Sequence, residues 1–186
     1  MPHIHTQPGQ HDFTVSLYVI RRGDAGEWQC LVHLHRKFGV YMPPGGHVEL
    51  DETVWQAAAH ELREEVGYEL ADLQVLQPYD TLPAIDLGVL QPVPFACATF
   101  RVGTAHFHND LCYGFVAETL PHLSVAADES QDVRWVSLPE LRQLQAKQKA
   151  LKNNLSLYAQ LIELAKTWHV MPAETFSCEK PRGNEV

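Results

Sequence analysis

Long apolar runs, paired cysteines and basic residues are scarce in this chain of 186 residues. No apolar run approaches the roughly 20 residues that a membrane-spanning helix needs. The opening residues, MPHIHTQPGQH, lack the basic segment followed by an apolar segment that marks a secretory signal. The 4 cysteines have no metal-like pairing, which is typical of reduced thiols. We therefore expect a cytoplasmic protein without membrane contact.

Basic charge is also outweighed by acidic charge. The 14 Lys and Arg residues face 23 Asp and Glu residues, which gives a formal net charge of −9. Such a surface opposes binding to a phosphate backbone, and no basic stripe with interleaved aromatic residues is present, so we exclude nucleic-acid polymers as partners. A nucleotide-sized substrate stays possible because a divalent cation neutralises phosphates locally. The length and 45% hydrophobic content indicate one domain, as a monomer or a homodimer.

The segment GHVELDETVWQAAAHELREEVGY, residues 46–68, predicts a short helix with an acidic end. Thr53 and Gln56 form a capping-box pattern that starts the helix at Val54, and Gly67 can adopt the left-handed conformation that ends it. At 100° per residue, one arc is apolar and is predicted to face the core; it holds Trp55, Ala58, Ala59, Leu62 and Val66.

Three carboxylates lie beside that apolar arc, in the last two turns of the predicted helix. The helix dipole is negative there, so each of Glu61, Glu64 and Glu65 should cost a few tenths of a kcal/mol or more. Their oxygens suit Mg²⁺ or Mn²⁺, which bind through a few carboxylates, waters and substrate phosphates. The alternative is a solvated acidic helix face, which Glu-rich helices often present.

The spacing of the whole segment favours the metal. Gly46, Glu52 and the run HELREEVGY at residues 60–68, preceded by PPGG at residues 43–46, closely resemble the Nudix box of the Nudix hydrolase superfamily. The resemblance implies an α/β fold, with a mixed β-sheet sandwiched between α-helices, over residues 12–168. Residues 1–11 would then be an N-terminal extension and residues 169–186 a C-terminal tail, polar and frayed from residue 174.

The same resemblance implies the chemistry. Members bind divalent cations, normally Mg²⁺, against the diphosphate of a small-molecule substrate that links a nucleoside diphosphate to another group. It implies metal-binding and catalytic roles for Glu61, Glu64 and Glu65, an additional ligand in the Gly46 carbonyl, and a supporting role for Glu52. One position departs, because His60 stands where the family pattern has Arg. An imidazole lacks the forked guanidinium geometry, although His60 can still reach Glu64 or Glu52.

The remaining pattern alternates strands and helices. We expect a hairpin from residues 13–21 and 29–35, further strands at 40–42, 69–77, 95–101, 111–117 and 133–136, and a proline-rich loop over 78–94. Ser137 and Glu140 form a second capping box. An amphipathic helix follows, with apolar residues at Leu151, Leu155, Tyr158, Ile162 and Ala165.

A second polar group lies outside the box. His106, His108 and Asp110 share one face of an extended segment, while Phe107, Leu111, Tyr113 and Phe115 share the other. The three polar residues could bind a metal, act as acid and base, bind substrate phosphate, or simply face water. A tetrahedral metal site would need a fourth ligand, and the spacing offers none, so we predict that the three contact substrate.

Two smaller candidates complete the predicted site. Glu129 precedes a strand, in a part of the chain where many Nudix enzymes place an additional acidic ligand or base; otherwise it is surface charge. Arg36, at a predicted strand end, could reach a phosphate or be solvated. Our interpretation is a Mg²⁺-dependent hydrolase of a phosphoanhydride bond. The rival is a module of the same fold that senses a nucleotide without cleaving it, and His60 is the residue that keeps this rival open.

Overall fold

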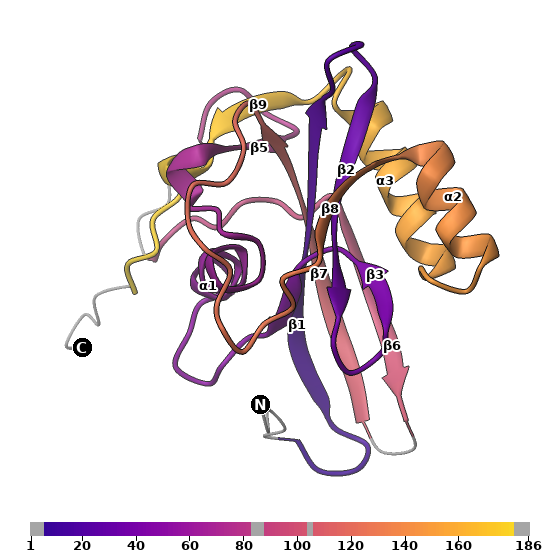
Figure 1. Cartoon of the computed structure of the whole chain (residues 1–186). Helices are drawn as coiled ribbons and strands as arrows, with labels where there is room; N and C mark the ends of the chain where they lie inside the picture. The colour runs from indigo at the N-terminus through magenta and orange to yellow at the C-terminus, as the bar shows by residue number, and fades with distance from the viewer. Residues whose placement is uncertain (1–5, 83–87, 104–105, 181–186) are drawn as a thin grey trace, which may run out of the picture.

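A mixed β-sheet with helices on both faces forms the molecule (Figure 1). The computed structural model describes residues 6–82, 88–103 and 106–180. Within these ranges the strands are β1 (His11–Arg22), β2 (Trp28–His35), β3 (Val40–Met42), β4 (Gly45–His47), β5 (Leu73–Gln77), β6 (Ala96–Val102), β7 (His106–Ala117), β8 (Val133–Ser137) and β9 (His169–Pro172). The helices are α1 (Val54–Val66), α2 (Leu138–Ala146) and α3 (Lys152–Leu164), with short 3-10 turns η1 (Leu70–Asp72) and η2 (Ala173–Thr175). None of these described helices has the length and apolar character that a membrane crossing requires.

The two long strands β1 and β7 form the centre of the sheet. They pair in parallel from His11 opposite Phe107 to Ile20 opposite Val116. The strand order is β3-β2-β1-β7-β5-β9, with β4 paired to β1, β6 to β7 and β8 to β2. Because successive side chains of a strand point to opposite faces, β1 contributes to two separate cores.

The first core packs against α1 and the second against α2 and α3. Val15, Leu17 and Val19 of β1 lie in the first, together with Trp55 and Leu62 of α1. Their neighbours Tyr18 and Ile20 lie in the second, with residues of α2 and α3 such as Leu141, Tyr158 and Leu161. Figure 1 shows α1 on one side of the sheet and the α2/α3 pair on the other. The predicted sandwich of a mixed sheet between helices is confirmed.

Local signals predicted most elements well. The β1/β2 hairpin pairs Ile20 with Cys30, and Thr53 and Ser137 both form the predicted capping boxes. The largest boundary differences are that β7 begins at His106, five residues before the predicted start, and that η1 occupies part of the predicted strand at 69–77. Within α1, Ala57 is buried, whereas Ala59 is only partly so. No strand forms in residues 78–82 and 88–94, as expected for the proline-rich loop; Pro83 lies outside the described residues.

The chain after residue 168 differs from the tail we expected. Residues 169–172 pair with β5 as the edge strand β9. Phe176 is 2% exposed and packs beside Trp55, whose indole Nε1 donates to the Phe176 carbonyl at 3.1 Å. The expectation of fraying from residue 174 is therefore wrong at Phe176. Apolar Phe176 stands alone in a polar segment, so no periodicity marked it as a core residue.

This contact gives a test of the C-terminal segment. Phe176→Ala should lower the free energy of unfolding by about 3 kcal/mol, because it removes a fully buried ring and leaves a cavity against α1. Urea unfolding of the full chain measures the change. Phe38→Ala is the matched control, since Phe38 is 59% exposed and its loss should stay within about 0.5 kcal/mol. Equal losses in the two variants would contradict the packing described here.

Candidate active site

The acidic half of α1 is held between two backbone contacts. Gly67 ends the helix with φ 73°, the left-handed conformation predicted for it. Beyond it, the loop that leads to β8 lies against this end: the Leu123 amide donates to the Gly67 carbonyl at 3.1 Å, and the Ala126 amide donates to the Glu64 carbonyl at 2.8 Å. The loop therefore satisfies backbone carbonyls that a helix end leaves unpaired.

On the opposite side, the glycines of β4 approach the carboxylates directly. The Gly45 amide donates to Glu65 Oε2 at 2.8 Å. A Cβ on Gly46 would lie 2.0 Å from Glu61 Oε1, so any other residue here would displace the Glu61 carboxylate. This contact places the Gly46 backbone beside Glu61, as the box resemblance implies. That the Gly46 carbonyl binds metal remains a prediction.

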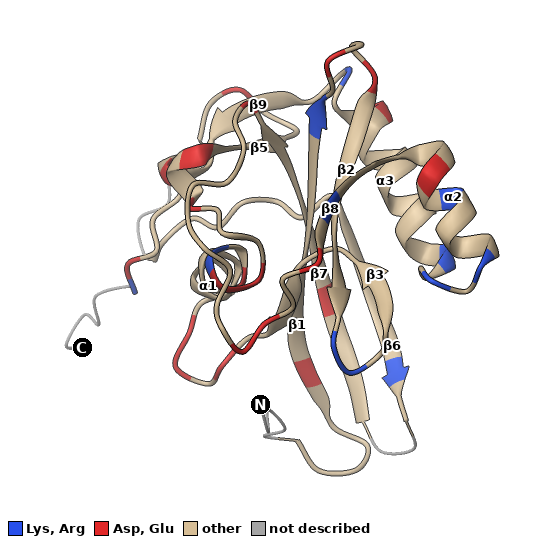
Figure 2. Ribbon diagram, viewed as in Figure 1, with Lys and Arg blue, Asp and Glu red and all other residues tan. Residues whose placement is uncertain are grey.

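The β8 loop brings Glu129 to the same place. The negative charge of Glu129 is among the causes that raise the pKa values of Glu61 and Glu65, and Glu64 in turn raises that of Glu129. Arg36 donates to the carbonyl of Asp128, the residue before Glu129. The structure thus groups the predicted residues Glu61, Glu64, Glu65, Glu129 and Arg36, and Figure 2 shows acidic residues gathered on α1 and its adjoining loops.

Negative charge in this group is poorly compensated. Burial, with added repulsion from Glu61, raises the pKa of Glu65 to about 9. Burial and neighbouring carboxylates likewise raise the pKa of Glu61 to about 7. His33, which sequence reasoning missed, lies 3.4 Å from Glu65 Oε2 through Nε2 but without hydrogen-bond geometry. Burial and then His35 lower the pKa of His33 to about 4, so it supplies no positive charge.

A divalent cation fits this arrangement. The donors are hard carboxylate oxygens, which suit Mg²⁺ and Mn²⁺, and the glycine strand leaves backbone rather than side chain facing Glu61. A cation would offset the burial cost and the carboxylate repulsion that together raise the pKa values of Glu61 and Glu65. Glu61, Glu64 and Glu65 are the residues that would hold it.

His60 bridges two carboxylates at the edge of this group. Its Nε2 lies 3.0 Å from Glu64 Oε1, and its Nδ1 lies 3.4 Å from Glu52 Oε1. Burial alone lowers the pKa of His60, but the hydrogen bond with Glu64 and the negative charges of Glu64, Glu61 and Glu52 outweigh it, so the pKa lies above its ordinary value. The expected contacts with Glu64 and Glu52 are therefore both present, made by the two ring nitrogens.

The second polar group lies elsewhere. Asp110 is buried, and its carboxylate accepts hydrogen bonds from the hydroxyls of Thr14 at 2.7 Å and Ser16 at 3.1 Å. His106 and His108 instead meet Asp12 and His47, and the ligand atoms of these four lie within 4.8 Å of one another. Our expectation that no further ligand offers itself is wrong, because β1 and β4 supply two that sequence spacing does not reveal. Substrate contact by His106, His108 and Asp110 remains untested.

Comparisons with known proteins agree with this geometry. The NUDIX domain model matches residues 11–159. The NAD-capped RNA hydrolase NudC of Pseudomonas aeruginosa is 31% identical over 145 residues, which cover 76% of this chain and 42% of that protein. The chain belongs to the Nudix hydrolase superfamily.

Solved structures share the fold. A hydrolase of the NUDIX family from Clostridium perfringens superimposes with a TM-score of 0.64 at 23% identity, covering 83% of this chain and 97% of that one. The NUDIX domain of Shewanella oneidensis NrtR, solved with ADP ribose, gives 0.57 at 16% identity, covering 82% and 87%. The chain spans less than half the length of the curated NudC relative it matches.

The raised pKa values give a test of the acidic group. Without divalent cations, folded Glu61 and Glu65 keep protons that the unfolded chain releases near the ordinary value of 4.5. The stabilisation is complete below that value and is lost as the pH rises through about 7 and about 9. We expect the thermal midpoint of the metal-free protein to fall over this window, and Mg²⁺ to reduce the fall.

The matched control is the double variant Glu61→Gln/Glu65→Gln, which cannot ionise at these positions. Its midpoint should depend less on pH over the same window. An identical pH dependence in the control and the parent protein would show that these two carboxylates do not carry the effect.

Proposed function

We propose that this protein is a Mg²⁺-dependent hydrolase that cleaves a phosphoanhydride bond in a nucleoside diphosphate-linked or related small molecule. The observation that carries the proposal is the convergence of Glu61, Glu64 and Glu65 with the Gly46 backbone and Glu129. Glu65 is buried and Glu61 partly so, and holding such carboxylates beside further negative charge without a matching cation is costly. A protein that only needed a stable helix would not benefit from them, whereas a cation-dependent site requires them.

Each residue has a distinct task in this scheme. When bound, Mg²⁺ (or Mn²⁺) neutralises the diphosphate and offsets the charge that develops on its oxygens. Glu64 accepts the proton of the attacking water, with Glu129 as the alternative base. The water oxygen forms a new bond to phosphorus, the bridging phosphorus–oxygen bond breaks, and its electron pair leaves with the departing phosphate. His60 and Glu52 hold Glu64 in place, and Arg36 is placed to meet a phosphate.

A nearby cleft suits the remainder of the substrate. It has a volume of about 440 Å³ and lies between the start of β1 and the loop that precedes α1, with Phe13, Leu50 and Glu52 in its lining. Glu52 links the cleft to the catalytic group through His60. Small nucleotide derivatives match its size, and the acidic charge of the chain favours such a substrate over an RNA. We propose a cytoplasmic monomer or homodimer.

The direct test is a product-release screen of the full chain with nucleotide sugars, dinucleotides, nucleoside triphosphates and a capped RNA. We expect two phosphorylated products from at least one small nucleotide, only with Mg²⁺ or Mn²⁺ present. Turnover confined to the capped RNA would contradict the assigned substrate class. Tight nucleotide binding in Mg²⁺ without any product would favour the rival, a nucleotide-sensing module.

The box carboxylates give the first variant. Glu64→Gln should lower kcat by roughly 100-fold or more at saturating Mg²⁺, because it deletes the base while nearly preserving shape. Thermal stability should be unchanged or slightly higher, since repulsion at the helix end falls. Glu163→Gln is the control, because Glu163 is exposed on α3 and its carboxylate pairs with Lys166 on the same helix. Full turnover in Glu64→Gln would remove Glu64 from the mechanism.

Variants of His60 test whether histidine at this position limits the rate of hydrolysis. His60→Arg should raise kcat/KM, because a permanent charge and a forked geometry hold Glu52 and Glu64 more firmly than an imidazole does. His60→Gln, which keeps a hydrogen bond but no charge, should lower kcat/KM. Steady-state kinetics at fixed Mg²⁺ compare the three proteins. A lower value in His60→Arg would instead mean that this chain has adapted its site to histidine.

A further inference from the structure

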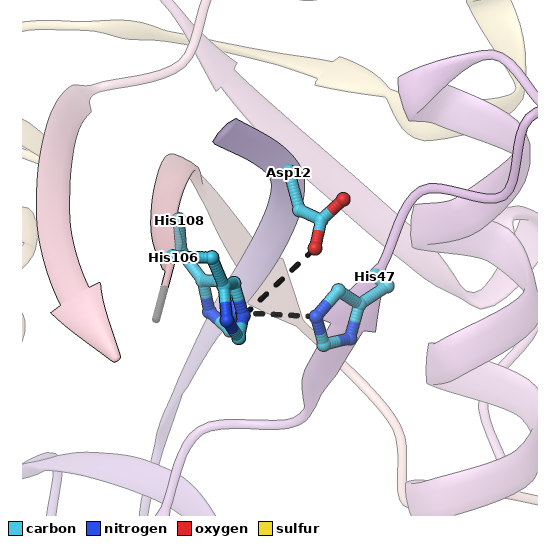
Figure 3. A group of neighbouring side chains, drawn as sticks. All are labelled: Asp12, His47, His106 and His108. Atoms are coloured by element: carbon cyan, nitrogen blue, oxygen red, sulfur yellow. Dashed lines mark hydrogen bonds and ion pairs between the residues drawn. The ribbon is translucent and has the colours of Figure 1, made fainter. Parts of the chain in front are cut away.

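Four side chains from three strands converge at one end of the sheet (Figure 3). His106 and His108 come from β7, Asp12 from β1 and His47 from β4. The Nε2 atom of His108 lies 3.0 Å from that of His106 and 3.2 Å from that of His47. Asp12 Oδ2 lies 3.9 Å from His106 Nε2. Asp12 and His106 are largely buried, with side chains 10% and 8% exposed.

This cluster lies on the face of the sheet away from α1. In β4, Gly46 faces Glu61, so the next residue, His47, points to the other face. In β1, Val15 packs in the core beside α1, whereas Asp12 alternates with it and shares the face of Thr14. The cluster is therefore separate from the carboxylates of the Nudix box, although β4 contributes to both.

Hydrogen bonding alone does not explain the meeting of the three rings. A ring nitrogen carries either one proton or one lone pair, so His108 Nε2 can make one good hydrogen bond, yet two other Nε2 atoms lie within 3.2 Å of it. A shared cation lets all three nitrogens act as electron-pair donors at once. Tetrahedral Zn²⁺ with bonds of about 2.0–2.1 Å places its nitrogen ligands about 3.3 Å apart, close to the 3.0 Å and 3.2 Å that separate His108 Nε2 from the Nε2 atoms of His106 and His47.

We propose that Asp12, His47, His106 and His108 bind one Zn²⁺ ion as a second metal site. Three imidazoles and one carboxylate suit Zn²⁺, whereas Mg²⁺ prefers an all-oxygen set. The Thr6 hydroxyl donates to Asp12 Oδ2 at 2.8 Å and thereby orients this ligand. This proposal does not rest on the proposed hydrolysis, because none of the four ligands is a box carboxylate.

Zinc at this point would act on the active site through β4. It would tie His47 to β1 and β7 and so fix the backbone of the preceding residue, Gly46, against Glu61. The ion would therefore have a positioning role, with four protein ligands and no requirement to contact substrate. Because the ligands are far apart in the sequence, binding should also stabilise the folded chain.

The test measures metal content directly. The full chain is stripped with a chelator and dialysed against a slight excess of Zn²⁺ with excess Mg²⁺ to occupy the box, and bound zinc is measured by mass spectrometry of the metal. We expect one Zn²⁺ per chain in the parent protein and in Glu61→Gln/Glu64→Gln. Affinity should fall more than about 100-fold in His47→Gln and in His106→Gln/His108→Gln. His122→Gln is the control, because His122 pairs with Asp72 outside the cluster and should leave zinc binding unchanged.

Two further measurements test the site even if one of the histidine variants does not fold. Co²⁺ substitution in the parent protein should give the intense visible absorption of a tetrahedral site, and Zn²⁺ should raise the thermal midpoint of the parent protein but not that of Asp12→Asn. The proposal is overturned if the parent protein retains no zinc, or if zinc is lost from Glu61→Gln/Glu64→Gln and retained by the histidine variants. A zinc-free protein whose KM rises in His106→Gln/His108→Gln would establish substrate contact in its place. Loss of hydrolysis with zinc retained would count against the proposed function and not against this site.

Discussion

The contact between a strand of glycines and the acidic end of α1 is the constraint on which the rest of the site depends. Helix α1 places three carboxylates where its own dipole repels them. Neutral backbone groups lie against these carboxylates: the Gly45 amide donates a hydrogen bond to Glu65, and the missing side chain of Gly46 leaves room for Glu61. Because these groups carry no full charge, the repulsion is only partly offset. The site therefore keeps negative charge that a bound divalent cation would neutralise.

Sequence reasoning succeeded where a signal is local. Thr53, Gln56 and Gly67 define α1 through capping and backbone conformation, and the spacing of the box predicted a group of carboxylates that the fold does bring together. It failed where a contact depends on strand register. Asp12 meets His106 and His47 meets His108 only because β1, β4 and β7 are aligned as they are, and nothing in the spacing of these residues along the chain encodes that alignment. Burial of His33 and Phe176 is likewise a tertiary property.

The sheet also separates two kinds of chemistry by strand alternation. The box carboxylates gather on the side of α1, and the cluster of three histidines with Asp12 gathers on the other. Cations sort between such sets by ligand type as much as by affinity. Strand β4 contributes adjacent residues to both sides, Gly46 beside Glu61 and His47 in the histidine cluster. A shift of its backbone would therefore affect both groups.

The parallel pairing of β1 with β7 has a consequence for how the chain acquires its structure. Partners such as Thr14 and Asp110, joined by a buried hydrogen bond, lie 96 residues apart. Closing so long a loop is entropically slow, and the centre of the sheet cannot form until most of the chain is available. During synthesis, one long edge of β1 therefore stays unpaired until β7 is made. Such an edge can pair with strands of other chains and so promote aggregation. The β2 and β4 pairings cover the opposite edge of β1 early, so the hazard is limited to the edge that β7 later occupies.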